Sequence, residues 1–347
     1  MTLESTPRGK PLVYYTHTCP PAGLARLQPW CDVSCSSGDT MPSNAEVATA
    51  AGEAVAICHF VNDLIDEDLI ARCAQLRILA GFGKGHDNVD VAAATRRGVW
   101  VTNVPTALTE TAADFAWALL MAVARNLVPA DRRVRSGTFA GWQAFDFIGH
   151  DVHGKVLGVM GFGLLGRALA RRARGFDMDV RYWDRRRAER GTEEALAAAF
   201  VDRDVLLRES DFVVLALPLT PETYHVVGSR ELSLMKTSAY LINPARGSEV
   251  DESAVARALA TGEIAGYAAD VFEVEDKQCP TRPGEIDPGL RALPSRTLLT
   301  PHIGTAVEET RTELARYQAA CVLQALRGLR PDGAVNDVAP WGPLIGR

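Results

Sequence analysis

The sequence predicts an α/β protein with two doubly wound parallel sheets, one in each of two domains. Three observations support this fold class. Short apolar runs alternate with helical stretches of about 10 to 15 residues along most of the chain, which is typical of βαβ units. A glycine-rich turn follows one of these runs in the second half of the chain. The length of 347 residues exceeds what one compact core usually serves, so two domains are expected.

The first hundred residues contain four apolar runs that we predict to be strands of one sheet, at residues 12–15, 54–58, 76–80 and 98–102. A long apolar helix is predicted over residues 109–127, with little polar surface. We expect this helix to be buried between domains or subunits and to form the hinge. It is also our reason for expecting a homodimer.

Six later apolar runs predict a second sheet, at residues 156–160, 180–183, 212–217, 239–242, 264–269 and 297–300. An amphipathic helix over residues 308–326 is expected to return to the first domain. The predicted domains are therefore 1–107 together with 306–347, and 108–305. Two such sheets are expected to leave a cleft, which is where open α/β folds usually bind ligands.

The glycine turn begins the second sheet's first βαβ unit. Gly161 allows a tight turn, Gly163 lets the backbone approach a pyrophosphate, and Gly166 lets the next helix pack closely. Asp184 ends the following strand, where a carboxylate accepts hydrogen bonds from the ribose hydroxyls of NAD. The turn therefore predicts NAD. Arginines at 185–187 leave some use of NADP open, because a guanidinium there can meet a 2′-phosphate.

The composition excludes several classes of partner. A formal net charge of −6 provides no general attraction to nucleic acid or to an anionic membrane. The N-terminal ten residues are polar, and no apolar stretch reaches the length of a membrane span. The seven cysteines are scattered without metal-ligand spacing, so we expect reduced thiols and no metal. We therefore expect a cytoplasmic protein whose substrate is a small anion.

Three polar clusters follow strands of the second half, at residues 243–248, 270–275 and 300–304. They supply an arginine, carboxylates and a histidine. Arginine binds an oxyanion, histidine exchanges a proton, and a carboxylate orients the imidazole. We single out His302 because Pro301 and Gly304 constrain its backbone, and we leave His86 as a loop residue.

With these motifs the chain resembles the D-isomer-specific 2-hydroxyacid dehydrogenase family over nearly its whole length. The resemblance implies a Rossmann-type cofactor domain and a flavodoxin-like substrate domain. It implies that Arg246 binds the substrate anion, that His302 is the acid/base and that Glu275 is its partner. Asp270 would contact the nicotinamide carboxamide. The implied cofactor-binding residues are Gly161, Gly163, Leu164, Leu165, Gly166, Asp184, Arg185, Pro218, Thr223, Ala245, Asp270 and Gly304.

Within that family, four details are similar to phosphonate (phosphite) dehydrogenases. Lys84 and Gly85 lie in a loop where those enzymes bind substrate through a lysine, and Trp142 matches their active-site tryptophan. Arg311 matches a further arginine, and residues 270–288 match their long connection before the histidine. A doubly charged phosphite needs more than one cation when it is buried, which agrees with this set. The chain departs from that group in carrying Phe147 in place of an active-site tyrosine, among other changes.

Three functions follow as hypotheses. The first is NAD-dependent oxidation of phosphite to phosphate. The second keeps the fold and cofactor but reduces a 2-oxo acid to a D-2-hydroxy acid, including substrates with a phosphonate or phosphate group such as phosphonopyruvate. The third is a non-catalytic NAD sensor, which the intact arginine, carboxylate and histidine disfavour.

Overall fold

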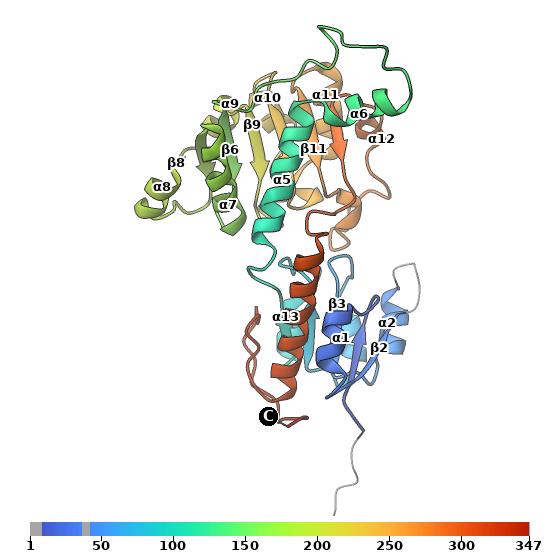
Figure 1. Ribbon diagram of the computed structural model, residues 1–347. Coiled ribbons are helices and arrows are strands. Elements are labelled where there is room, and N and C mark those ends of the chain that lie inside the picture. The colour runs from blue at the N-terminus through green and yellow to red at the C-terminus, as the bar shows by residue number, and fades with distance from the viewer. Residues whose placement is uncertain (1–8, 37–41, 347) are drawn as a thin grey trace, which may run out of the picture. The chain divides into compact units, whose positions relative to one another are not determined.

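The computed structural model describes residues 9–36 and 42–346, so most of the polar N-terminal segment lies outside it. The chain divides into two compact units, shown in Figure 1. Unit 1 comprises Met1–Leu108 and Val307–Arg347, and unit 2 comprises Thr109–Ala306. Each unit contains one parallel sheet, which confirms the predicted fold class.

Unit 1 is built on a five-stranded parallel sheet in the order β2-β1-β3-β4-β5. Its strands are β1 Leu12–Tyr15, β2 Asp32–Cys35, β3 Ala56–His59, β4 Ile78–Gly81 and β5 Trp100–Thr102. Its helices are α1 Pro21–Leu27, α2 Asn44–Ala50, α3 Glu67–Arg72, α4 Val91–Arg96 and α13 Glu308–Leu326. Side chains alternate along each strand, so α1 and α13 cover one face and α2, α3 and α4 cover the other.

The four strands predicted for this unit are present, and one strand was missed. β2 has the sequence Asp-Val-Ser-Cys at an edge of the sheet, and three of its four residues are exposed. It therefore carries no apolar run that would predict a strand. The predicted helix over 308–326 is confirmed as α13, which packs on α1 and β4 in this unit.

A buried carboxylate joins the ends of two strands of unit 1. Asp63 accepts hydrogen bonds from the Thr16 hydroxyl at 2.5 Å and the Phe60 N–H at 2.7 Å, and His17 Nε2 lies 3.5 Å away. Burial acts to raise the pKa of Asp63, but these donors outweigh it and hold the pKa below its ordinary value of 3.8. The carboxylate therefore stabilises the fold most in its ionised form.

Asp63→Ala is expected to lower the free energy of unfolding by about 2–4 kcal/mol at pH 7, because it leaves buried donors without an acceptor. A group with a lowered pKa stabilises the fold above its unfolded pKa and loses that effect as the pH falls through its folded pKa. The difference between the variant and the wild type should therefore shrink below about pH 3.8. Urea unfolding measures both. The exposed Asp32→Ala is the control, and an equal loss there would contradict the prediction.

Unit 2 contains a seven-stranded parallel sheet in the order β12-β11-β10-β9-β6-β7-β8. Its strands are β6 Val156–Met160, β7 Asp179–Trp183, β8 Ala198–Phe200, β9 Phe212–Leu215, β10 Tyr240–Asn243, β11 Gly266–Ala269 and β12 Thr297–Leu299. Its α-helices are α5 Thr109–Ala124, α6 Leu127–Arg135, α7 Leu164–Ala173, α8 Arg190–Leu196, α9 Arg203–Glu209, α10 Ser229–Leu234, α11 Glu252–Thr261 and α12 Pro288–Arg291. Three short 3-10 helices are η1 Arg174–Phe176, η2 Gly247–Glu249 and η3 Glu273–Glu275.

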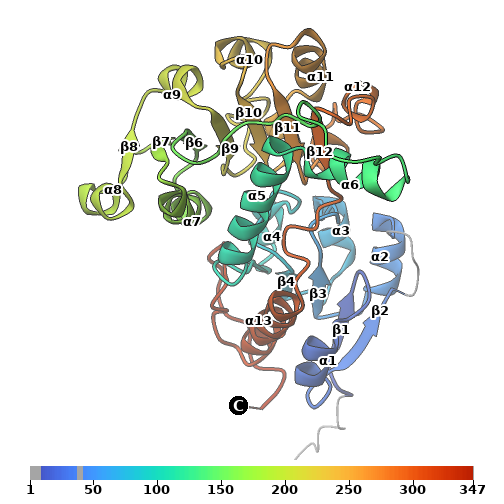
Figure 2. The ribbon, with the colours of Figure 1, turned by 45° about the horizontal axis from the view of Figure 1, so that its top comes forward.

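Helices cover both faces of this sheet, as Figure 2 shows. α5 and α7 pack on one face, and α9, α10 and α11 pack on the other. The six predicted strands are present. β8 was missed because it has only three residues and an exposed centre.

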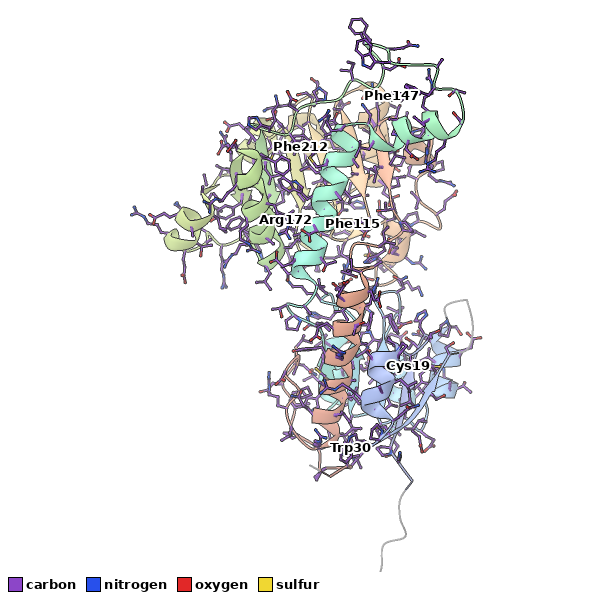
Figure 3. All side chains as sticks on the ribbon, in the orientation of Figure 1. Cys19, Trp30, Phe115, Phe147, Arg172 and Phe212 are labelled. Carbon is purple, nitrogen blue, oxygen red and sulfur yellow. The ribbon has the colours of Figure 1, made fainter. Side chains whose placement is uncertain are left out.

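The structure accounts for the apolar side of the helix at 109–127 within unit 2, and its burial between domains or subunits stays a prediction. α5 packs on α7, β10, β11 and β12, so unit 2 buries its apolar side within its own core. Trp117 and Leu120 are 8% and 0% exposed there. A polar side of α5 is held by ion pairs: Arg172 of α7, labelled in Figure 3, donates through Nε to Asp114 at 2.8 Å. This helix therefore gives no support to the homodimer.

No single helix in residues 9–36 and 42–346 has the length and apolar content to cross a membrane, although α5 and α6, bent by 67°, meet that test as a pair.

Candidate active site and cofactor site

The glycine turn connects β6 to α7. Gly161 has φ +98°, and a Cβ there would lie 2.5 Å from the Ala216 carbonyl oxygen. A Cβ on Gly166 would lie 2.1 Å from the carbonyl oxygen of Gly161, so α7 packs directly on the turn. Gly163 has open space around it, and no side chain caps the start of α7, which continues with Leu164 and Leu165. The start of this helix therefore presents N–H groups to an open position, which fits a pyrophosphate.

Asp184 follows β7, and its side chain contacts the glycine turn after β6. Its Oδ2 accepts the Phe162 N–H at 2.8 Å. Of the three arginines that follow, Arg187 is bonded to Glu193 at 2.8 and 2.9 Å, whereas Arg185 is exposed. The acid expected to bind ribose thus lies beside the glycine turn, and one of the arginines available to a 2′-phosphate is committed elsewhere.

The loop after β9 is closed by Thr223. Its hydroxyl donates to the Pro218 carbonyl at 2.7 Å and accepts the Thr220 N–H at 2.8 Å. These bonds fix residues 218–223 at the carboxyl end of the strand beside β6. This is the edge of the sheet at which open α/β folds bind ligands.

Asp270 follows β11 and organises the turn that carries the histidine. Its carboxylate is 2% exposed and accepts the Thr300 hydroxyl at 2.6 Å, the Ile303 N–H at 2.9 Å and the Gly304 N–H at 2.7 Å. The backbone N–H of His302 donates to the Asp270 carbonyl at 2.8 Å. The sequence did not reveal this anchoring role. The predicted contact of Asp270 with nicotinamide stays a prediction.

His302 and Glu275 form the predicted pair. His302 Nδ1 lies 2.7 Å from Glu275 Oε2, and Glu275 Oε1 accepts the Phe272 N–H at 2.7 Å. The carboxylate is thus held by the backbone of its own turn while it orients the ring. When Nδ1–H donates to Glu275, Nε2 is left to exchange a proton, and it has no partner in the part of the chain that the structure describes.

Arg246 lies at the neighbouring strand end. β10 and β11 are adjacent and in register, with Asn243 beside Ala269. Asn243 shapes the turn by donating to the Arg246 carbonyl at 2.7 Å and accepting the Ala245 N–H at 3.0 Å. The structure therefore brings the predicted arginine, glutamate and histidine to the ends of three neighbouring strands, β10, β11 and β12.

Unit 1 contributes the two predicted substrate-binding cations, Lys84 and Arg311. The guanidinium of Arg311, in the first turn of α13, lies 5.7 Å from the ring centroid of Phe82, two residues before Lys84. The Lys84 carbonyl accepts the Asn103 side-chain N–H at 2.7 Å, which fixes the loop that continues into Gly85. Lys84 is exposed, and partial desolvation of its ammonium lowers its pKa. An anion bound next to this ammonium would stabilise its charged form.

Trp142 lies on the segment between α6 and β6 and is 85% exposed. Six other apolar residues on α6 and this segment are also exposed, with exposed fractions from 39% to 88%. They are Leu127, Val134, Phe139, Phe145, Phe147 and Ile148. Nothing within unit 2 covers Trp142, and its substrate contact stays a prediction. No cluster of His, Cys, Asp or Glu suited to a metal occurs in the described ranges 9–36 and 42–346.

Comparison with known proteins agrees with this geometry. Residues 117–304 match the NAD-binding domain of the D-isomer specific 2-hydroxyacid dehydrogenases. The chain is 40% identical to glyoxylate reductase from Thermococcus litoralis, covering 96% of this chain and 99% of the relative. Glyoxylate reductase from Korarchaeum cryptofilum is 41% identical, over 94% of this chain and 96% of the relative.

A solved structure is similar over nearly the whole chain. It is an NADPH-dependent glyoxylate/hydroxypyruvate reductase from Sinorhizobium meliloti in complex with NADP and malonate. Identity is 28% and the TM-score is 0.82, with coverage of 98% of this chain and 99% of that one.

These relatives are named glyoxylate reductase and not phosphite dehydrogenase, so the finer resemblance to phosphite dehydrogenases is not supported. The coarser one is. The glycine turn, Asp184 and the matched domain make NAD the cofactor. The chain is an NAD-dependent oxidoreductase and belongs to the D-isomer specific 2-hydroxyacid dehydrogenase family.

Proposed function

We propose that the protein reduces a small 2-oxo acid, with glyoxylate as the first candidate, to the 2-hydroxy acid. One observation carries this proposal. His302 is oriented through Nδ1 by Glu275, which leaves Nε2 to act as an acid, at the strand end beside the turn of Arg246. The relatives named glyoxylate reductase support the choice of substrate.

Each group has a separate role in the proposed reaction. Bound NADH supplies the hydride that reduces the carbonyl carbon. Arg246 holds the substrate carboxylate, and His302 donates a proton from Nε2 to the carbonyl oxygen as that oxygen gains negative charge. Glu275 stabilises the cationic ring before the proton leaves. The oxo acid thus gains one hydride and one proton.

We propose that the glycine turn with Leu164 and Leu165 binds the cofactor's pyrophosphate and that Asp184 binds its ribose. Pro218, Thr223, Ala245, Asp270 and Gly304 would line the rest of the cofactor site. NAD is preferred to NADP because Asp184 repels a 2′-phosphate and Arg187 is engaged by Glu193. Arg185 remains to account for any use of NADP.

Oxidation of phosphite is the second candidate. The cations of unit 1 favour it, because Lys84 and Arg311 exceed what a monocarboxylate requires. In that reaction, phosphite, water and NAD give phosphate and NADH, and His302 takes a proton from the water. A 2-oxo acid with a second anionic group, such as phosphonopyruvate, would also use these cations.

One assay distinguishes 2-oxo acid reduction, phosphite oxidation and a non-catalytic NAD sensor. The enzyme is mixed with NADH and glyoxylate, pyruvate or phosphonopyruvate, and separately with NAD and phosphite, while the absorbance of reduced cofactor is followed. Loss of NADH with glyoxylate supports the proposal. Gain of NADH with phosphite alone would replace it with the second candidate. Tight NAD binding without turnover of any oxyanion would point to a sensor.

Lys84→Ala is expected to raise the KM for the preferred anion about tenfold or more, because an interaction between charged groups is lost from the bound substrate. Steady-state kinetics measure the change. Lys10→Ala, another lysine of unit 1, should leave KM unchanged. If Lys84→Ala left both KM and kcat at wild-type values, Lys84 would not bind substrate.

We propose that the protein is a homodimer in which a second copy covers α6 and the segment after it. Phe145 and Ile148 are 88% and 67% exposed there, an unusual gathering of apolar side chains for a monomer's surface. Sedimentation should give about twice the 37.5 kDa of one chain. Phe145→Ser should shift the mass toward one chain, whereas Leu329→Ser in unit 1 should not. A monomeric wild type would contradict the proposal.

A further inference from the structure

Two strand-end turns of unit 2 are joined by a pair of buried glutamates. The Glu252 N–H donates to Glu273 Oε1 at 3.0 Å, and the Glu273 N–H donates to Glu252 Oε1 at 2.8 Å. The two side chains are on residues that are 2% and 7% exposed. Glu252 begins α11 and Glu273 begins η3, so each carboxylate caps the helix that the other residue begins.

This arrangement places two carboxylates side by side in the core. Burial raises the pKa of Glu252, while N–H donors from Asp287 and Glu273 partly oppose that rise. The Asp287 N–H donates to Glu252 Oε2 at 3.0 Å. Such a pair is costly unless further donors satisfy it, so its presence calls for a reason beyond packing.

His225 supplies the remaining donor and contacts both turns. Its Nε2 lies 3.0 Å from Glu273 Oε2, in η3, and its backbone N–H donates to the Ser248 carbonyl in η2 at 2.8 Å. Its backbone is left-handed, with φ +49°, and its ring stacks on Tyr224 at 4.0 Å between centroids. A histidine rarely adopts this backbone conformation unless the surroundings hold it there.

The two turns carry the proposed catalytic groups. η2 begins directly after Arg246, and η3 ends at Glu275, the partner of His302. The turns also touch through Gly247, where a Cβ would lie 1.9 Å from the Phe272 carbonyl carbon. The separation of Arg246 from the Glu275–His302 pair is therefore set where η2 meets η3.

We propose that His225 and Glu273 are positioning residues that fix the Arg246 turn against the Glu275 turn and thereby set the geometry in which the substrate anion meets His302. This inference rests on the proposed function. A misplacement of about 1 Å at such a site costs about 100-fold in rate, so loosening this contact should affect activity more than stability.

The test compares His225→Ala and Glu273→Ala with two matched variants. His225→Gln keeps an N–H donor near the position of Nε2, so it should rescue the contact to Glu273. Asp211→Asn is the structural control. Asp211 also accepts a backbone N–H, that of Val156 at 2.9 Å. It precedes β9, so it lies at the amino ends of the strands, whereas the proposed site lies at their carboxyl ends.

Kinetics with glyoxylate and NADH, the Kd for NADH, the Kd for oxalate and urea unfolding are measured for each variant. Both alanine variants should raise the KM for glyoxylate and lower kcat, each about tenfold, while the Kd for NADH stays within about twofold. The Kd for oxalate, which mimics the anion at Arg246, should rise in parallel. His225→Gln should recover most of both effects, and Asp211→Asn should change only unfolding.

Normal KM, kcat and oxalate binding in folded alanine variants would overturn the positioning role, leaving the contact purely structural. If the wild type did not turn over glyoxylate, the proposed function would fail by itself, and the oxalate measurement would still decide the positioning role. A wild type that neither turned over glyoxylate nor bound oxalate would overturn both.

Discussion

Replacement of His302 by asparagine is expected to lower kcat by about 1000-fold, within the usual range for loss of a general acid. Asparagine is the informative substitute for two reasons. Its side-chain N–H can replace Nδ1 in the 2.7 Å contact with Glu275, and asparagine tolerates the left-handed backbone that His302 adopts at φ +54°. The variant therefore removes the proton donor at Nε2 while it preserves the turn.

The readouts of this variant separate proton transfer from folding and cofactor binding. Stopped-flow reduction of glyoxylate gives the chemical rate, and fluorescence titration gives the Kd for NADH, which should not change. His153→Asn is the control, since His153 is 76% exposed beside Asp177. If His302→Asn retained a tenth or more of the wild-type rate, another group would have to supply the proton.

The sequence predicts most of the fold because the information is local. Strands such as β6 and β9 are apolar on both sides, so they are recognised as buried runs in a parallel sheet. β2 and β8 form strands because they pair with an adjacent strand of the sheet. Their own sequences carry no buried apolar run that would predict a strand. The apolar surface of α5 was read correctly as buried, but the sequence does not say which surface buries it.

The candidate site is predictable to the same extent. Chemistry-bearing residues at strand ends, such as His302 and Arg246, can be found from their position after an apolar run. Roles that depend on contacts between neighbouring strands cannot be found in this way. Asp270 anchors the histidine turn, and Glu252 and Glu273 cap one another, only because β10, β11 and β12 are adjacent in the sheet. No spacing along the chain encodes that adjacency.

The glycine turn allows packing to be separated from cofactor binding. Gly166→Ala is expected to lower the free energy of unfolding by about 1–3 kcal/mol, because the added Cβ meets the Gly161 carbonyl oxygen at 2.1 Å and the backbone must move. The start of α7 moves with it, so the Kd for NADH should rise about 100-fold. Urea unfolding and fluorescence titration measure the two effects.

Gly163→Ala should give a different pattern. Its φ of −72° suits alanine, and no atom lies within 4 Å of the added Cβ, so stability should not fall. NADH binding should still weaken, by about tenfold or more, if the pyrophosphate approaches the backbone at this residue. Gly175→Ala, also in open space but in η1, should change neither quantity appreciably. Normal NADH affinity in Gly163→Ala would mean that the open space at the start of α7 is not where the phosphates bind, whatever the effect of Gly166→Ala.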